Sequence, residues 1–328
     1  MRETVKLIEV ARELPVSRKD VQMLLLLLFC GLFAYLANLA DPALEPLFLA
    51  LTFGIIAGNL QKDENKKMIA EKYIPLLLPV GITLYGVNIN IPYLGEFHPE
   101  VVAATLISAT LIFLAVFWIS TRLKLSRQMS ILLACGSGIC GVSAIAIISP
   151  LIKPKKEEFS AAIMIITAVG LTGAIIYPAL ALLSNMSPEE FAVLSGATLH
   201  QTGIVKISSQ LFGIEEEALA IKGIRIAMIA LVVLILSILY SESRFYVPWY
   251  IVSFLGMALF SSTYLPGEIV QTLRPLATLM FATTLAAIGY TVSVGRVKRV
   301  GVKPLIAAYA GWMVGVAFMM LLIGGRVL

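Results

Sequence analysis

The feature that most constrains this chain is a series of apolar segments long enough to cross a lipid bilayer. A crossing helix needs about 20 apolar residues, and no segment shows the roughly ten-residue alternation of polarity typical of a membrane β-barrel. Only 14% of the 328 residues are charged, against about 25% in soluble domains. The apolar windows lie at 21–39, 46–60, 74–91, 101–121, 129–150, 159–184, 191–212, 219–240, 248–265, 275–292 and 304–325. We therefore predict an all-α polytopic membrane protein with about 11 transmembrane helices.

Positive charges in the short loops predict how these segments are oriented. Lys and Arg concentrate in the cytoplasmic loops of membrane proteins, and here they gather in the N-terminal tail, at 61–73, at 122–128 and at 293–303. The pattern predicts a cytoplasmic segment 1–20, then a single transmembrane domain 21–328 in the cell membrane, with the C-terminus outside. It also explains the net charge of +5 without a nucleic-acid partner.

One loop conflicts with eleven full spans. Lys153, Lys155 and Lys156 would then face outward, against the usual charge bias. If 129–150 and 191–212 were re-entrant instead, this loop would lie inside and every other loop would still agree. Both segments are long enough to cross, so we expect eleven spans and keep the re-entrant alternative open.

A faint internal repeat predicts a symmetric design. Residues 86–90 and the apolar segment after them resemble 289–293 and its sequel. With helix 21–39 as an extra element, repeat one would cover 44–184 and repeat two 191–325. Five segments in each repeat would invert the second copy relative to the first, as in many secondary transporters.

The fourth segment of each predicted repeat is interrupted by small and hydroxyl-bearing residues. Residues 136–141 match G-x-G-x-x-G, but the dinucleotide fingerprint needs a soluble strand–turn–helix unit, and here the flanks are apolar. A broken transmembrane helix that builds a binding site and a small-residue packing face fit the segment equally well. Residues 282–289 have the same character, so two broken helices could direct their amides at one spot. The predicted substrate-binding residues are Gly136, Ser137, Gly138, Cys140, Gly141, Ser143, Thr283 and Thr284.

Ionisable residues inside the apolar segments indicate the charge of the ligand. No Asp or Glu lies within a predicted span, which disfavours a cation because a cation needs a counter-charge there. An ionisable group at membrane depth is a candidate for function, but Lys222 and Arg225 stand near a helix start, so we favour snorkelling for these two. His200 and Gln201 form a mid-span polar cluster and, with Lys206, are the candidates for coupling or secondary binding. Basic groups, hydroxyls and helix N-termini without a buried acid predict an anion site.

The chain shows no set of residues typical of an enzyme, a metal site or a cofactor site. Cys30, Cys135 and Cys140 lie in apolar segments with spacing that fits neither disulfides nor zinc, so no metal and no cofactor are expected. A serine protease within the membrane would pair Ser137 or Ser143 with His200, which we regard as the least favoured interpretation.

The stretch 132–145, followed by Pro150 and the Glu157–Glu158 pair, resembles the signature of the YeiH-type family of predicted sulfate exporters. The likeness continues through 177–178, 196–200, 222–225, 248–249 and 286–289, and covers nearly the whole chain from about residue 20. The resemblance implies a multi-pass inner-membrane transporter related to the bile-acid/sodium symporter and cation–proton antiporter superfamily. That superfamily has inverted five-helix repeats and two crossing broken helices in a core that moves against a panel.

One departure from the family pattern concerns coupling. There the histidine is usually followed by an acidic residue and later by Gln, whereas Gln201 and Ile204 stand at those places here.

From the residues and the resemblance together, we expect an elevator-type transporter of a small anion, sulfate-like or a small organic acid. Its expected partners are the bilayer and a coupling ion, proton or sodium. An anion channel is the alternative, and a homodimer is left open.

Overall fold

The computed structural model describes residues 17–41, 44–61, 63–88, 97–210, 212–240, 249–292, 295 and 300–325. Within these ranges all regular structure is helical, and seven helices are long and apolar enough to cross a membrane. The prediction of an all-α polytopic membrane protein is confirmed at this level. Most of the predicted N-terminal segment, residues 1–16, and parts of both repeat motifs, residues 89–90 and 293, lie outside the described residues.

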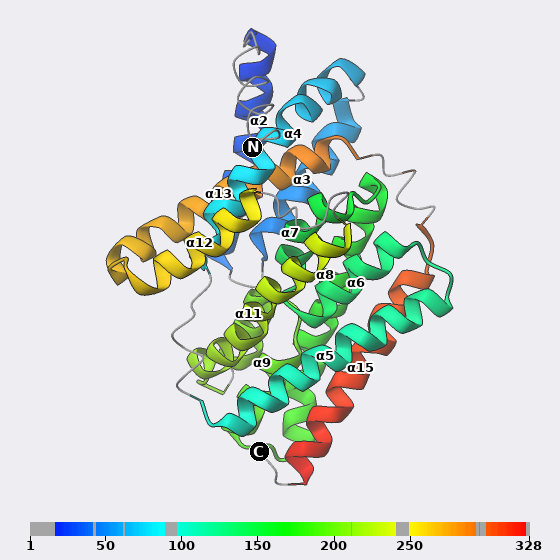
Figure 1. Ribbon diagram of the computed structural model, residues 1–328, viewed down its shortest axis with the longest axis vertical. Helices are drawn as coiled ribbons and strands as arrows, with labels where there is room; N and C mark the ends of the chain where they lie inside the picture. Colours follow the sequence, from blue (N-terminus) through cyan, green and yellow to red (C-terminus); the bar gives the residue numbers. More distant parts are fainter. Residues whose placement is uncertain are drawn as a thin grey trace. The chain divides into compact units, whose positions relative to one another are not determined.

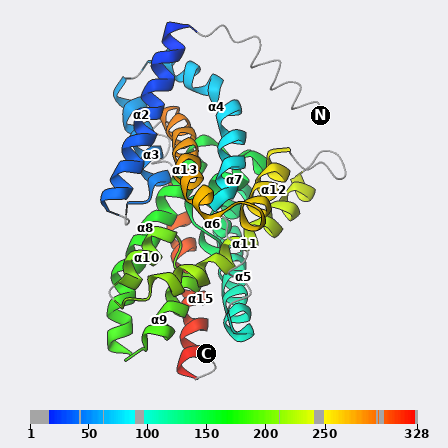
Figure 2. The ribbon, with the colours of Figure 1, turned by 90° about the vertical axis from the view of Figure 1, so that its left-hand side faces the viewer.

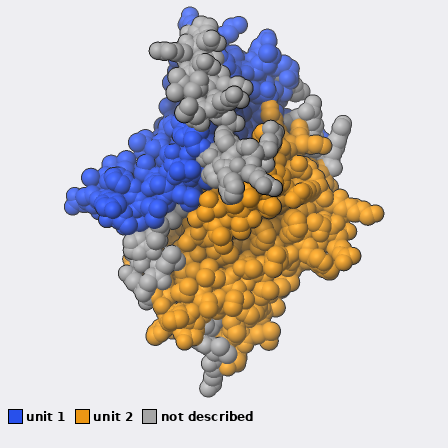
Figure 3. Space-filling view, viewed as in Figure 1, with its two compact units in different colours: residues 1–40, 46–89, 241–296 blue, residues 41–45, 90–240, 297–328 orange. Residues whose placement is uncertain are grey.

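The chain divides into two compact units (Figure 3). Unit 1 is built from Met1–Ala40, Pro46–Ile89 and Ser241–Arg296, and unit 2 from Asp41–Glu45, Asn90–Tyr240 and Val297–Leu328. These boundaries do not follow the predicted repeats, whose limits stay a prediction.

Unit 1 is organised around one central helix, which packs against three others (Figure 1). Its helices are α2 (Arg18–Ala40), α3 (Pro46–Gln61), α4 (Glu64–Tyr85) with the 3-10 turn η1 (Gly86–Asn88), α12 (Trp249–Thr263) and the central α13 (Gly267–Tyr290). Glycines allow a very close approach between α3 and α13. A Cβ added to Gly54 would lie 2.2 Å from the carbonyl oxygen of Ala286, and one added to Gly289 would lie 2.2 Å from that of Leu51. Unit 1 therefore uses small-residue helix packing, as membrane helices commonly do.

The prediction of a helix break at Thr283 and Thr284 is wrong. Helix α13 runs without interruption, and both hydroxyls donate to backbone carbonyls four residues earlier, at 2.8 and 3.0 Å. Thr283 faces Gly31 of α2 and Thr284 faces Gly81 of α4 closely enough that a Cβ on either glycine would crowd the threonine hydroxyl. The small and hydroxyl residues of this segment serve packing, because a hydroxyl bonded to its own helix leaves the helix intact.

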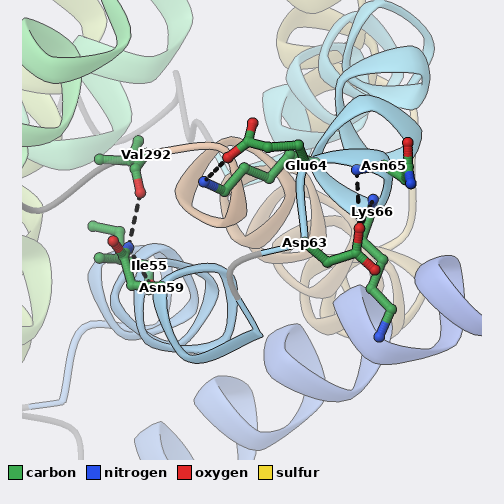
Figure 4. A network of polar contacts seen from close by, with 8 residues as sticks. Ile55, Asn59, Asp63, Glu64, Asn65, Lys66 and Val292 are labelled. Atoms are coloured by element: carbon green, nitrogen blue, oxygen red, sulfur yellow. Dashed lines mark hydrogen bonds and ion pairs between the residues drawn. The ribbon is translucent and has the colours of Figure 1, made fainter.

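Polar contacts fix the ends of helices in unit 1 (Figure 4). Asn59 near the end of α3 donates to the carbonyl oxygens of Ile55 at 2.7 Å and of Val292 at 2.8 Å, which joins α3 to the residue just beyond α13. Asp63 caps α4 by accepting from the backbone N–H groups of the two residues after Glu64. A side-chain cap of this kind satisfies amides that have no partner inside the helix.

Unit 2 combines four long helices with four short ones. The long helices are α5 (Pro99–Arg122), α8 (Lys156–Leu183), α11 (Glu215–Tyr240) and α15 (Lys303–Gly324). The short ones are α6 (Arg127–Gly138), α7 (Val142–Ile152), α9 (Pro188–Thr198) and α10 (Thr202–Gln210). Each short helix packs against at least two of the long ones, so the long helices act as a scaffold for the short pairs.

Helices α6 and α7 form a helical hairpin, called hairpin 1 (residues 127–152). Ser126, the N-cap of α6, donates a 2.7 Å hydrogen bond to Glu158 in the first turn of α8, so both ends of the hairpin lie together. A Cβ on Gly136 would lie 2.8 Å from Cδ1 of Ile145, whereas a straight helix would separate these two positions by about 13 Å. The chain therefore turns back on itself after α6.

Helices α9 and α10 form a second hairpin, called hairpin 2 (residues 188–210), visible in green in Figure 2. The rings of Phe191 and Phe212 lie 4.4 Å apart, centroid to centroid, and the hydroxyls of Ser195 and Ser209 lie 3.3 Å apart. A straight helix would place the two phenylalanines about 31 Å apart. These contacts support the re-entrant alternative for 129–150 and 191–212 rather than two full spans. Hydropathy could not distinguish the two, because it measures the length of an apolar segment and not a reversal of its direction.

The hairpin geometry predicts the side of the membrane on which the lysine-rich loop lies. In a cysteine-free background, Lys124→Cys and Lys155→Cys should react with a membrane-impermeant maleimide from the same, cytoplasmic face, because both ends of hairpin 1 lie together. Asn185→Cys, beyond the 28-residue helix α8, should react from the opposite face and serves as the control. Labelling of position 155 from the outside would restore the eleven-span topology.

Candidate functional site

The tip of hairpin 1 consists of residues 139–141, which are not helical. Ile139 has φ −113° and ψ −92°, and Gly141 has φ +69° and ψ −126°. A positive φ strains any residue with a Cβ, and a Cβ on Gly141 would also lie 2.8 Å from Cγ of Gln201 in hairpin 2. Of the two interpretations of this segment, the broken helix is therefore confirmed, and Gly141 is the point where the two hairpins touch.

The tip of hairpin 2 consists of residues 199–201. Leu199 is extended, with φ −69° and ψ 149°, and ends α9, whereas α10 begins at Thr202. Both His200 and Gln201 are buried, at 0% and 1% exposure. Irregular backbone at membrane depth needs partners inside the protein, and for both tips these partners come from α11.

Lys222 and Arg225 of α11 bind the backbone carbonyls at the two tips. Lys222 Nζ donates to the oxygens of Leu199 and, at 3.1 Å, of Ile139. Arg225 donates from Nη1 to Leu199 at 2.8 Å, from Nε to Gly138 at 3.1 Å and from Nη2 to Ser137 at 2.6 Å. The two side chains thus join hairpin 1 to hairpin 2.

The interpretation of Lys222 and Arg225 as snorkelling residues is wrong. Both side chains are fully buried, at 0% exposure. They stand seven and ten positions after Glu215, the start of α11. At the rise of an α-helix these positions lie about 10 and 15 Å from the helix start. The second distance equals about half of the thickness of a hydrocarbon core, which is roughly 30 Å. The sequence feature that could have indicated a buried role is a pair of cations at positions i and i+3 of one helix face, with no acid beside them on that face.

The charges at the tips do not balance. The C-termini of α6 and α9 each contribute about −0.5 of an elementary charge, and the N-termini of α7 and α10 about +0.5 each, so these dipoles largely cancel. Among the described residues, the buried carboxylate is Asp20 of unit 1, which pairs with Lys72 at 3.2 Å. Lys222 and Arg225 therefore have no buried carboxylate as a partner in the described part of unit 2.

Several polar atoms at the tips lack a partner within the described residues. These atoms are Ser137 Oγ, Gln201 Oε1 and both ring nitrogens of His200. Gln201 is oriented by its amide nitrogen, which donates to the hydroxyl of Thr167 on α8 at 2.8 Å. Buried polar groups without hydrogen bonds are rare and costly, so these atoms are candidates to contact a ligand or a proton at the tips.

Aromatic rings lie beside His200. Trp312 of α15 lies 5.6 Å from His200, centroid to centroid, and stacks on Tyr177 of α8 at 5.7 Å. The Tyr177 hydroxyl is 2.5 Å from that of Thr198, the last residue of α9. Helices α8 and α15 thereby hold the end of α9 and the histidine in place.

The structure brings most of the predicted site residues together. Unit 2 gathers Gly136, Ser137, Gly138, Cys140, Gly141, Ser143, His200 and Gln201 at or beside the two tips. Ser143 donates to the carbonyl oxygen of Cys140 at 3.1 Å and lies 3.0 Å from its sulfur. Lys206 is exposed on α10, and Thr283 and Thr284 belong to unit 1.

The second broken segment is 191–212, not 275–292 as predicted. In the described ranges no three His, Cys, Asp or Glu side chains cluster as metal ligands.

The contact at Gly141 predicts unequal costs for two glycine substitutions. Gly141→Ala should lower the free energy of unfolding in detergent by about 1–2 kcal/mol for the positive φ and by about 1–3 kcal/mol more for the overlap with Gln201. Gly213→Ala is the matched control, because Gly213 also has a positive φ (+66°) but its Cβ would meet nothing within 4 Å. Equal losses in the two variants would show that the tips do not touch at Gly141.

Comparison with known proteins identifies the family. A family model described as "Conserved hypothetical protein 698" matches residues 22–308. The chain is 84% identical over 328 residues to a UPF0324 membrane protein of Archaeoglobus fulgidus, with 100% of both chains covered. It is 29% identical over 307 residues to a UPF0324 membrane protein of Yersinia pestis, covering 86% of this chain and 83% of the relative. It is 26% identical over 307 residues to the UPF0324 inner membrane protein YeiH of Escherichia coli K12, covering 87% and 85%. No solved structure matches. The resemblance to the YeiH-type family is thus confirmed, and the chain belongs to the UPF0324 family of membrane proteins.

Proposed function

We propose that this protein is a secondary transporter that moves a small anion across the cell membrane by alternating access. The observation that carries the proposal is the buried pair Lys222 and Arg225, which faces backbone carbonyls and no carboxylate among the described residues. The substrate is sulfate-like or sulfite-like, or a small organic acid. By analogy with the name of the Escherichia coli relative, the membrane is the inner, cytoplasmic one.

The energetics favour an anion as the missing partner. An unpaired ion in a protein interior costs several kcal/mol even after relaxation, and backbone carbonyls offset only part of that cost. Lys222 uses two of its three N–H donors on carbonyls, and Arg225 uses three of its five. The remaining donors, together with the amides that begin α7, suit oxyanion oxygens.

The proposed topology has both hairpins entering the membrane without crossing it. The crossing helices would be α2, α3, α4, α5, α8, α11, α12, α13 and α15. Hairpin 1 then enters from the cytoplasm and hairpin 2 from outside, so their tips meet near the midplane. The basic loops 122–128, 153–156 and 293–303 all lie in the cytoplasm in this arrangement, which agrees with the positive-inside rule.

The two-unit division supports an elevator mechanism. Both tips, both cations and the four scaffold helices belong to unit 2, so the whole anion site could move as one body against unit 1. Secondary transporters commonly place their site between half-helices and expose it alternately by such movement.

Two alternatives to a transporter are an anion channel and an intramembrane hydrolase. An anion channel would use the same cations, and it would differ by conducting without saturation at low substrate concentration. An intramembrane hydrolase would need a serine bonded to His200, whereas neither ring nitrogen of His200 nor the Ser137 hydroxyl has a partner among the described residues. That absence weighs against a hydrolase.

Replacing either cation should remove anion transport. Reconstituted wild-type protein should take up labelled sulfate, sulfite or a small carboxylate with saturation, and Lys222→Met and Arg225→Met should reduce this uptake at least about 100-fold, a loss of roughly 3 kcal/mol in transition-state stabilisation. Lys303→Met, which removes an exposed lysine at the start of α15, should transport normally.

A binding measurement separates loss of transport from loss of folding. The substrate anion at 100 times its Kd should stabilise the wild-type protein by about 2.7 kcal/mol and raise its unfolding temperature, and it should leave the folded Met variants unchanged. The proposal is overturned if folded wild-type protein neither takes up nor is stabilised by any of these anions. Flux far above carrier turnover without saturation would instead establish the channel.

A further inference from the structure

His200 is the buried titratable group that the proposed anion site does not use. Its side chain is 0% exposed, and neither ring nitrogen has a hydrogen-bond partner within the part of the chain that the structure describes. A histidine that only served packing would be expected to bond at least one nitrogen, because a buried donor without an acceptor loses the hydrogen bond it made to water. One ring nitrogen carries a lone pair that is free to take a proton.

In the described part of unit 2, His200 lies beside two cations, and no carboxylate is buried there. Helix α11 presents Lys222 and Arg225, both bonded to the carbonyl oxygen of Leu199, the residue directly before His200. Helix α15 presents Trp312, against which the rings of Tyr177 and Tyr309 pack. Thr167 of α8 accepts from the neighbouring Gln201, and in the tip of hairpin 1 the Cys140 sulfur accepts from Ser143. Within its own hairpin the nearest charged side chain along the sequence, Lys206, is exposed.

We propose that His200 binds the proton that couples to anion movement, an inference that rests on the proposed anion transport. The two cations of α11 repel a proton from the imidazole while the site is empty. An anion bound to them cancels that repulsion, so anion and proton bind together and each raises the affinity for the other. The proton adds to the free ring nitrogen from one side of the membrane and leaves from it to the other side, together with the anion.

Trp312 lies beside the imidazole of His200, with the ring centroids 5.6 Å apart and the ring planes tilted by 59°. A tryptophan within about 6 Å of a cation stabilises it when the cation lies over the face of the ring. Gln201, the neighbour of His200 in the tip of hairpin 2, cannot hold a proton at physiological pH, so the coupling proton is assigned to the imidazole of His200.

The test counts protons per anion in sealed proteoliposomes. Labelled sulfate, or whichever of the probe anions proved to be taken up, is followed in exchange without a pH gradient and in uptake driven by an acidic exterior, with a trapped pH dye. Wild-type protein should move about one proton per anion, as one titrating imidazole allows. In His200→Gln the gradient should no longer drive accumulation, and the proton count should fall to zero for each anion still exchanged.

The other histidine provides the matched control. His98, which precedes α5, is the only other histidine among the 328 residues, and His98→Gln should keep the wild-type proton count. Exchange by wild-type protein without any proton movement would overturn the coupling role and leave anion transport standing, whereas no exchange at all would overturn the proposed function itself. A His200→Gln variant that still moves protons would also overturn the inference, because His200 would then be dispensable for coupling. A His200→Gln variant that folds but no longer binds the anion would overturn it as well, because His200 would then be part of the anion site.

Discussion

The arrangement of unit 2 depends on buried cations that bind backbone carbonyls at the interrupted ends of helices. A helix that stops halfway across a bilayer exposes carbonyl groups that cannot reach water, and each such group costs several kcal/mol in hydrocarbon. Lys222 and Arg225 satisfy these groups for two helices at once. In return the carbonyls stabilise charges that would otherwise be expelled from the interior. Neither the broken helices nor the buried charges would be tolerable without the other.

This mutual dependence explains why unit 1 and unit 2 use small residues differently. In α13 the threonine hydroxyls bond to their own helix and the glycines admit neighbouring helices, so the helix remains whole. In hairpin 1 Gly141 stands where φ is positive, and α11 supplies donors for the carbonyls that the turn releases. The same composition therefore gives a packed helix in one unit and a binding tip in the other.

The sequence predicted the class of protein and a helix break within 137–143, because apolar length and glycine spacing are local signals. It did not predict that 129–150 turns back, since a hydrophobic segment of 22 residues has the same composition whether it crosses or returns. The lysine-rich loop at 153–156 was the one local sign of the reversal. Thr283 and Thr284 were misassigned because hydroxyl content cannot show whether a side chain bonds to its own helix or to a ligand. The role of Lys222 and Arg225 depends on contacts more than 80 residues away for hairpin 1, which no local pattern contains.

The shared acceptor at Leu199 has a consequence for how this site can change during evolution. One backbone oxygen accepts from both cations, and the other acceptors of these two cations, at Ser137, Gly138 and Ile139, are also main-chain carbonyls. Side chains at 137, 139 and 199 can therefore be exchanged without removing an acceptor from this set, whereas a Cβ on Gly138 would lie 3.0 Å from Cβ of Phe113. Related proteins can thus vary the side chains at the tips while the main-chain framework that binds the two cations stays the same. Substitutions at position 222 or 225 are constrained more strongly. Both side chains donate to the carbonyl oxygen of Leu199, so the loss of one changes the hydrogen bonding and the electrostatic environment of the other.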